Sequence, residues 1–361
     1  MTRFTASPRP LAPVTAGLVL MLAAPLCAAT TQPSLGRDVE PRVNQALAYL
    51  ARQQKPDGSF DDGGNPPAST ALTGLSLLAF LSAGHMPDQG RHGLVVRGAL
   101  DYLLKQSQEG EAYLGRSQGS RLYGHAIATL ALAEVYGNES DPAQRRTVRE
   151  ALEKSVAVLL RAQQAKKSQV SHEGGWRYEP ESDDSDLSVT AWCALAIRGA
   201  QNAALRVPDE SPRRAVAFVL NCHNPQTGGF AYQPGSGPSA SMTGAAVLTL
   251  CLLDAADKPQ VRDAAVYLQK NLVDERTKYF SYSLYYTTQA AFQLGGATWD
   301  AIWRNTVQQL AQRQLADGSF RPAAPEPGRV LDRDHAVAVY ATSMGVLTLT
   351  VPYRLLPIYQ K

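Results

Sequence analysis

The sequence predicts an all-α fold built from six helical hairpins. The first indication is a repeated motif: a glutamine, three residues, a glycine, one residue and an aromatic. Clear copies end at Phe60 and Phe320, and weaker copies between them end at Tyr113, Trp176, Phe230 and Phe280. The second indication is that each copy follows a segment with apolar residues spaced three and four apart and precedes a more apolar segment. A unit repeated along the whole chain is typical of stacked hairpins.

The two segments of each unit differ in polarity, which predicts two layers of helices. The first segments, such as 43–54 and 145–164, carry charge on one face and should lie outside. The second segments are apolar on nearly every side, which predicts that they are buried. In chain order they read TALTGLSLLAFLSAG, LYGHAIATLALAEVYG, LSVTAWCALAIRGA, MTGAAVLTLCLLDAA, LYYTTQAAFQLGG and HAVAVYATSMGVLTL.

The residues of the repeated motif predict a structural joint between neighbouring units. A glutamine at the end of an outer helix can bond backbone groups at the start of the neighbouring inner helix. The glycine permits a tight reversal, and the aromatic ring covers the joint. We therefore expect these residues to hold the fold together.

Residues 1–29 have the pattern of a secretory signal peptide, which leaves 30–361 as one domain. Two arginines precede an apolar stretch at 14–26, and small residues follow it. A lipoprotein anchored at Cys27 is the alternative, although the bulky Leu26 fits that processing poorly. No later stretch is long and apolar enough to span a bilayer. We expect an exported protein, periplasmic or secreted.

The composition argues against binding to nucleic acid. The chain has 35 Lys and Arg against 32 Asp and Glu, a formal net charge of +3. Proteins that bind the phosphate backbone usually concentrate basic residues on one face. The 44% share of hydrophobic residues is sufficient for a packed core. The sequence therefore predicts a globular protein with no nucleic-acid partner.

The repeat resembles the one shared by squalene–hopene cyclases and protein prenyltransferase β subunits, over roughly residues 40–355. This resemblance implies a single (α/α)6 toroid, with six inner helices around a central cavity and six outer helices around them. The stretches GGWRYEP and YRLLPIY are similar to exported single-barrel relatives of unassigned activity. Triterpene cyclases use two such barrels, whereas this chain has residues for one.

The resemblance also implies where a cyclase would hold its proton donor. The family motif D-x-D-D-T-A opens an inner helix before a tryptophan, and Asp183 and Asp186 match its first and last acids, ahead of Trp192. Ser185 stands where the central, proton-donating aspartate belongs, and a hydroxyl is far too weak an acid to protonate an alkene. Asp183 and Asp186 are therefore candidate catalytic residues, and the alternative is that they only cap the helix.

No metal or cofactor site is predicted. The prenyltransferase resemblance would imply zinc held by Asp, Cys and His, with Asp and Cys two residues apart. Cys193, Cys222 and Cys251 have no aspartate at that spacing, and zinc needs three or four converging ligands. Their disulfide state is open, either one pair or none.

Polar and aromatic residues at the starts of the inner helices are candidate ligand-binding residues. If the ring closes, they lie near one rim of the cavity, where Tyr can shield a cation and His can act as acid or base. The alternative is that each histidine is a structural residue. The candidates are Tyr123, His125, Trp176, Tyr282, Tyr285, Tyr286, Asp334 and His335.

Three functions remain open on this evidence. The first is non-covalent binding of a small lipophilic or peptide ligand in the central cavity. The second is a terpenoid cyclase or isomerase acting on an isoprenoid. The altered acid motif leaves open whether such a protein would be catalytic. The third is carbohydrate chemistry, because exported (α/α)6 barrels also include polysaccharide lyases and glycosidases. The fold alone does not choose between them.

Overall fold

The computed structural model describes residues 39–61, 69–108, 112–116, 120–139, 141–321 and 334–360. The predicted signal peptide at 1–29 lies outside these ranges. For residues 69 and 334–337 the structure describes the backbone and not the side chains. Within the described ranges the chain forms twelve α-helices and no β-strand, which confirms the predicted all-α class.

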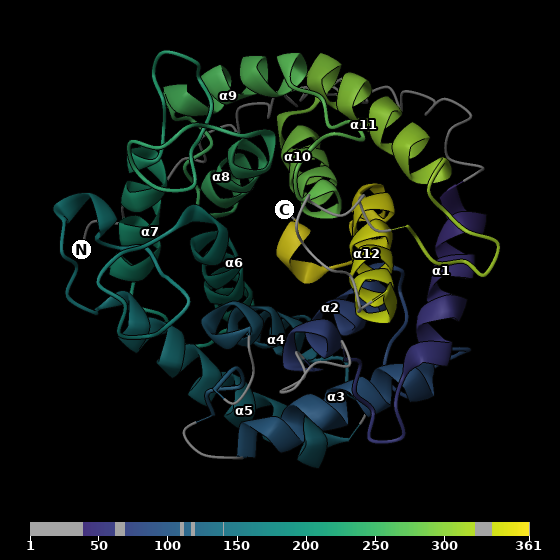
Figure 1. Cartoon of the computed structure of the whole chain (residues 1–361). Helices are drawn as coiled ribbons and strands as arrows, with labels where there is room; N and C mark the ends of the chain where they lie inside the picture. Colours follow the sequence, from purple (N-terminus) through teal and green to yellow (C-terminus); the bar gives the residue numbers. More distant parts are fainter. Residues whose placement is uncertain are drawn as a thin grey trace, which may run out of the picture. The chain divides into compact units, whose positions relative to one another are not determined.

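Outer and inner helices alternate along the chain (Figure 1). The outer helices are α1 (Val39–Gln53), α3 (Gly93–Gln108), α5 (Pro142–Gln163), α7 (Glu210–Asn221), α9 (Pro259–Lys270) and α11 (Gly296–Ala311). The inner helices are α2 (Ser69–Ser82), α4 (Arg121–Val135), α6 (Leu187–Asn202), α8 (Ala240–Leu252), α10 (Phe280–Leu294) and α12 (Asp334–Leu349). Each inner helix contacts the next, and α12 returns to α2, so the ring closes into a single α/α toroid.

Burial follows the polarity of the two kinds of helix. In α8 every residue from Ser241 to Leu252 is buried, because neighbours cover this apolar helix on all sides. In α7 only Ser211, Ala215, Phe218 and Val219 are buried, which gives one inward stripe at helical spacing. The apolar pattern thus assigns each helix to its layer correctly.

Among the outer helices, the main packing partner of each inner helix is the one that follows it in the chain. The last inner helix, α12, has no following outer helix and packs against α1 instead. The first and last helices of the ring therefore cover each other, and the toroid depends on contacts between its two ends.

The motif glutamine joins neighbouring outer helices. The Gln54 amide Nε2 donates to the carbonyl of Gly58 in its own loop, at 3.0 Å, and to the carbonyl of Val95 in α3, at 2.8 Å. The prediction that this residue bonds the start of an inner helix is wrong. The loop reverses so tightly that the glutamine reaches the first turn of the next outer helix.

The same joint recurs around the ring and closes it. Gln163 links α5 to Ser211 in α7, at 2.9 Å. Gln314, the last copy, donates to the carbonyl of Arg42 in α1, at 2.8 Å. The backbone N–H of the motif aromatic also donates to a threonine hydroxyl on the inner helix, in the pairs Phe60–Thr73, Trp176–Thr190, Phe230–Thr243 and Phe320–Thr342.

The chain end reaches the middle of the ring (Figure 1). After α12, the 3-10 turns Val351–Tyr353 and Pro357–Tyr359 lead it across the C-terminal ends of the inner helices. Asn202, the last residue of α6, donates a long hydrogen bond to the Pro357 carbonyl at 3.4 Å.

None of the described helices combines the length and the apolar character needed to cross a membrane.

The motif glycines provide a test of the joint between units. Gly318 has φ +94°, and a Cβ there would lie 2.3 Å from the carbonyl oxygen of Gln45 in α1. We expect Gly318→Ala to lower the free energy of unfolding by about 2–5 kcal/mol, from backbone strain plus steric overlap. Urea denaturation measures this change.

The matched control is Gly235→Ala. Gly235 also has positive φ, at +80°, but nothing lies within 4 Å of the Cβ position. Gly235→Ala should lower the free energy of unfolding through backbone strain alone, by about 1–2 kcal/mol. Equal losses for the two variants would show that the close approach of Gly318 to α1 contributes nothing.

Candidate functional site

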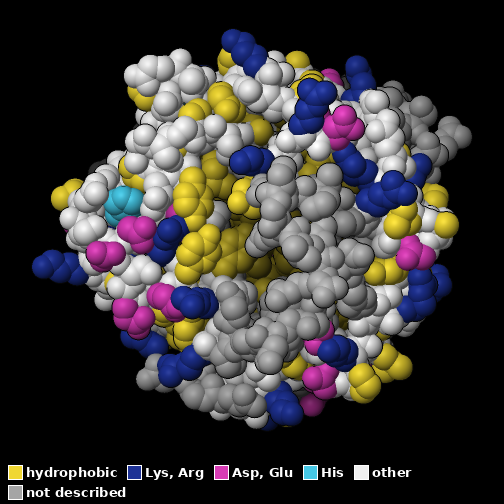
Figure 2. Space-filling model, in the orientation of Figure 1, with side chains coloured by type: hydrophobic (Ala, Val, Ile, Leu, Met, Phe, Trp, Pro, Cys, Tyr) yellow, Lys and Arg dark blue, Asp and Glu magenta, His cyan; other side chains and the backbone are white. Residues whose placement is uncertain are grey.

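Five aromatic side chains from three inner helices meet near the centre of the ring, and we call them the aromatic cluster: Tyr123, Trp192, Tyr282, Tyr285 and Tyr286. The Trp192 ring stacks on the Tyr285 ring, with centroids 5.8 Å apart and planes 4° apart. The indole Nε1 of Trp192 donates to the Tyr123 hydroxyl at 2.9 Å. Figure 2 shows a hollow at the centre of this face with hydrophobic side chains at its base.

The tyrosine hydroxyls of the cluster differ in their bonding. Tyr282 and Tyr286 lie with ring centroids 4.7 Å apart, and their buried hydroxyls have no partner of normal hydrogen-bond geometry among the described residues. Burial raises the pKa of both phenols well above the usual value. Both therefore stay neutral, and each can donate a hydrogen bond to a polar group placed beside it.

Four of the predicted site residues belong to this cluster. Tyr123 opens α4, and Tyr282, Tyr285 and Tyr286 lie in the first two turns of α10. Trp192, which connects the two helices, was noted in the sequence only as the landmark of the acid motif. Trp192 is the sixth residue of α6 and apolar. Nothing in the sequence distinguishes it from an ordinary core residue.

His125 does not share the central position, and this prediction is wrong. Its ring is fully buried, with Nδ1 accepting the backbone N–H of Leu114 at 3.1 Å. The other nitrogen, Nε2, lies 3.0 Å from the carbonyl of Ser155 in the outer helix α5 and donates to it. Burial lowers the pKa of His125 to about 4, so the ring is neutral and holds two helices together.

Trp176 is also a structural residue. Its side chain is buried, and the indole Nε1 donates to the Leu159 carbonyl of α5 at 2.8 Å. This burial and this bond support the alternative, a joint between helices, rather than the predicted ligand-binding role. The side chains of Asp334 and His335 lie outside the described residues, so their predicted roles stay predictions.

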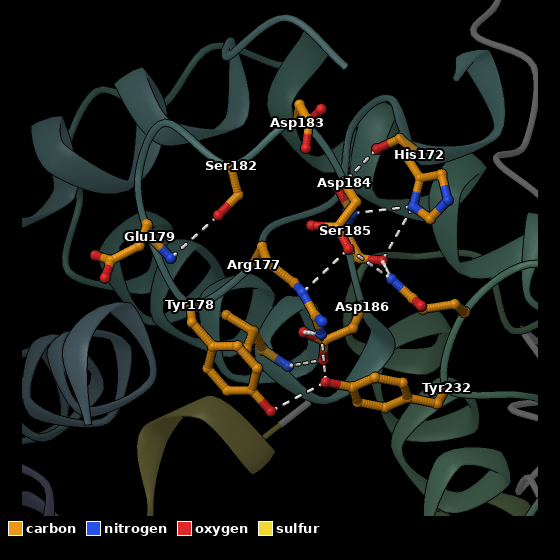
Figure 3. A network of polar contacts seen from close by, with 12 residues as sticks. His172, Arg177, Tyr178, Glu179, Ser182, Asp183, Asp184, Ser185, Asp186 and Tyr232 are labelled. Carbon is orange, nitrogen blue, oxygen red and sulfur yellow. Dashed lines mark hydrogen bonds and ion pairs between the residues drawn. The ribbon is translucent and has the colours of Figure 1, made fainter. Parts of the chain in front are cut away.

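Asp186 is the N-cap of α6. Its Oδ1 accepts the backbone N–H of Val189 at 2.9 Å and the hydroxyl of Ser188 at 2.6 Å. Its Oδ2 accepts from the guanidinium of Arg177 at 2.8 Å (Figure 3). Asp186 is fully buried and accepts every one of these bonds, which supports the capping alternative rather than proton donation.

Arg177 ties the acidic loop to its surroundings. Besides Asp186, its guanidinium pairs with Asp184 at 3.2 Å and bonds the hydroxyl of Tyr232. The same group lies over the Tyr178 ring, 4.9 Å from the centroid. These partners raise the pKa of Arg177 despite its partial burial, so the cation is permanent. Sequence reasoning did not identify this role, although Arg177 directly follows a motif aromatic.

The rest of the acid motif is structural as well. Ser185 is buried, and its hydroxyl donates to the His172 carbonyl at 2.8 Å, while its N–H donates to His172 Nδ1 at 2.9 Å. The side chain of Asp183 is exposed, and its backbone carbonyl accepts the backbone N–H of Ser168 at 2.8 Å. The loop that would carry the acid of a cyclase therefore builds the start of α6.

A polar depression lies outside the ring, beside the C-terminal end of α5. It has about 800 Å³ of space, and its walls include Arg161, Lys166, Glu179 and Glu181. Glu179 is ion-paired with Arg121, so one of the two carboxylates is already neutralised. Among the described residues, no group of three His, Cys, Asp or Glu is placed to hold a metal.

Comparison with known proteins agrees with this architecture. Residues 174–283 match the model of the prenyltransferase alpha-alpha toroid domain. The predicted likeness to terpenoid cyclase-like toroids is confirmed.

The cysteines at 193, 222 and 251 are buried and joined by no disulfide in the part of the chain described.

Solved structures from two enzyme classes share the fold. The type II terpene cyclase MstE from Scytonema superposes with a TM-score of 0.60 at 15% identity, over 89% of this chain and 99% of the cyclase chain. The GH76A alpha-1,6-mannanase from Salegentibacter sp. HEL1_6 superposes with a TM-score of 0.61 at 13% identity, over the same shares. These likenesses show the fold alone.

The two ends of the acidic loop should respond differently to loss of charge. In Asp186→Asn the amide still caps α6, but Arg177 loses its closest carboxylate. We expect the free energy of unfolding to fall by about 2–4 kcal/mol. Asp183→Asn, at an exposed side chain, should stay within about 0.5 kcal/mol of the parent protein. Thermal and urea unfolding of both variants checks this, and equal effects would contradict the assigned roles.

Proposed function

We propose that this protein is exported and binds a lipophilic small molecule of the isoprenoid class in the hollow above the aromatic cluster. The observation that carries the proposal is the convergence of Trp192 and four tyrosines from α4, α6 and α10 at the centre of the ring. Their ring surfaces suit an alkyl and alkene chain. The neutral phenol of Tyr123, the partly exposed member of the cluster, suits a single polar head group. Export rests on the pattern of residues 1–29.

One related structure supports the choice of ligand class. A variant of the Scytonema cyclase is described in complex with geranylgeranyl dihydroxybenzoate as its substrate. That molecule combines an isoprenoid chain with a polar aromatic head. The same general chemistry fits a cluster of aromatic rings with neutral phenols.

Binding without cyclisation is favoured over a cyclase. Starting such a reaction needs a carboxylic acid that is neutral and faces the alkene. At the corresponding loop, Ser185 replaces the central acid and Asp186 is engaged with Arg177 and the start of α6. We therefore propose that the bound isoprenoid leaves unchanged.

A carbohydrate substrate is less favoured. Glycoside hydrolysis needs two carboxyl groups on either side of the scissile bond, about 5–10 Å apart. The aromatic cluster, as described, contributes phenols and an indole but no carboxylate. The mannanase likeness therefore supports the shared ring and not a shared reaction.

Direct binding tests the proposal. Calorimetric titration of the mature protein with farnesol and with geranylgeraniol should show saturable binding. Trp192→Phe should weaken that binding by about tenfold or more, because it reduces the central stacking surface and removes the bond to Tyr123. Trp299→Phe on the outer helix α11 is the matched control and should bind as the parent protein does.

The recovered ligand separates the alternatives. Mass spectrometry should return the isoprenoid unchanged after incubation. Absence of binding to both alcohols, or equal binding by Trp192→Phe, would contradict the proposed site. A cyclised product would establish the cyclase alternative, and a co-purifying sugar or peptide would replace the isoprenoid class.

A further inference from the structure

The C-terminal segment, which we define as Val351–Gln360, has polar contacts with Tyr285, Glu134 and Asn202 of the inner helices among the described residues. The hydroxyl of Tyr359 lies 2.6 Å from that of Tyr285 in α10. The backbone N–H of Ile358 donates to Oε2 of Glu134 in α4 at 3.2 Å. The side chains of Ile358 and Tyr359 are buried, so the segment is part of the core.

Glu134 is a buried carboxyl group that the sequence analysis did not single out. It lies in the last turn of α4 with 1% of its surface exposed. Its second oxygen, Oε1, is buried without a hydrogen-bond partner among the described residues. A Cβ at Gly199 of α6 would lie 3.6 Å from that oxygen, so the glycine leaves room for the group.

The surroundings of Glu134 favour its protonated form. Burial raises the pKa of Glu134 to about 8, and only the Ile358 N–H opposes that shift. The titratable groups that face it are the phenols of Tyr285 on α10 and Tyr359 in the C-terminal segment, both neutral. The inner helix α2 has no ionisable residue, and on α6 the guanidinium of Arg198 pairs with Asp254 instead.

We propose that Glu134 is a protonation-dependent latch for the C-terminal segment. With its proton, Glu134 accepts the Ile358 N–H and lies in the core as a neutral acid. When the proton passes to water, a carboxylate with one hydrogen bond and no contacting cation among the described residues remains buried, which is costly. Release of the segment exposes that carboxylate to water and removes the cost.

The direction of the pH dependence follows from proton binding. Between the ordinary pKa of an exposed glutamate, about 4.5, and the value of about 8 in the closed state, the closed state binds more protons than the open state. The closed state therefore loses stability as the pH rises through this window. Well above pH 8 both states are ionised, and the loss levels off.

Hydrogen exchange of the full mature chain tests the latch. Protection of the amides of Ile358 and Tyr359, corrected for intrinsic exchange, should fall roughly ten- to a hundredfold between pH 6 and pH 9. In Glu134→Gln, which cannot ionise, the protection should be the same at both values. Amides of α8 serve as an internal reference for global unfolding.

Two further variants separate the latch from general loosening. Glu139→Gln is the matched control, because Glu139 is buried but bonded to the Gly137 N–H and beside Arg145, and it should keep the parent response. Tyr359→Phe should lower protection at both pH values by the same factor. A parent protein without the fall, or Glu134→Gln with the parent's fall, would overturn the proposal.

Discussion

The structure depends on closure of the ring between the two ends of the domain. The last inner helix, α12, has to pack against α2 to complete the inner ring and against α1 to be covered from outside. Buried hydroxyl pairs mark this seam: Ser76 with Ser343 at 3.1 Å, and Ser82 with Thr350 at 2.8 Å. Without this seam, α1 and α12 would each expose an apolar face, and the centre of the ring would open to water.

Closure also explains how the candidate site is built. The aromatic cluster draws on α4, α6 and α10, which are brought together because closure arranges the inner helices around one axis. The C-terminal segment then lies across one end of the ring, where the inner helices end. The acidic loop is fixed by Arg177 and serves to start α6. The site therefore consists mainly of rings and hydroxyls.

Much of the architecture could be predicted from the sequence because it depends on local repetition. The Gln–Gly–aromatic motif and the two polarity classes of helix predicted the number of hairpins and the layer of each helix, and the family resemblance implied the closed ring. The contact of Gln54 with α3 could not be predicted, because it depends on how far the loop reverses. His125 was predictable: Tyr123 and His125 are two residues apart, about 200° around a helix, so they cannot face the same side. Trp192 and Glu134 look like ordinary inner-helix residues until the facing helices are known.

Closure is tested most directly by a covalent link across the seam. Ser76 and Ser343 are 267 residues apart in sequence, yet their hydroxyl oxygens lie 3.1 Å apart, so cysteines at both positions should form a disulfide under mild oxidation. The double variant Ser76→Cys, Ser343→Cys should show this bond by mass spectrometry of peptides and unfold at a higher temperature when oxidised, since the bond closes a very long loop. Two thiols that stay reduced in the folded protein would mean that α2 and α12 do not meet and that the helices form an open superhelix.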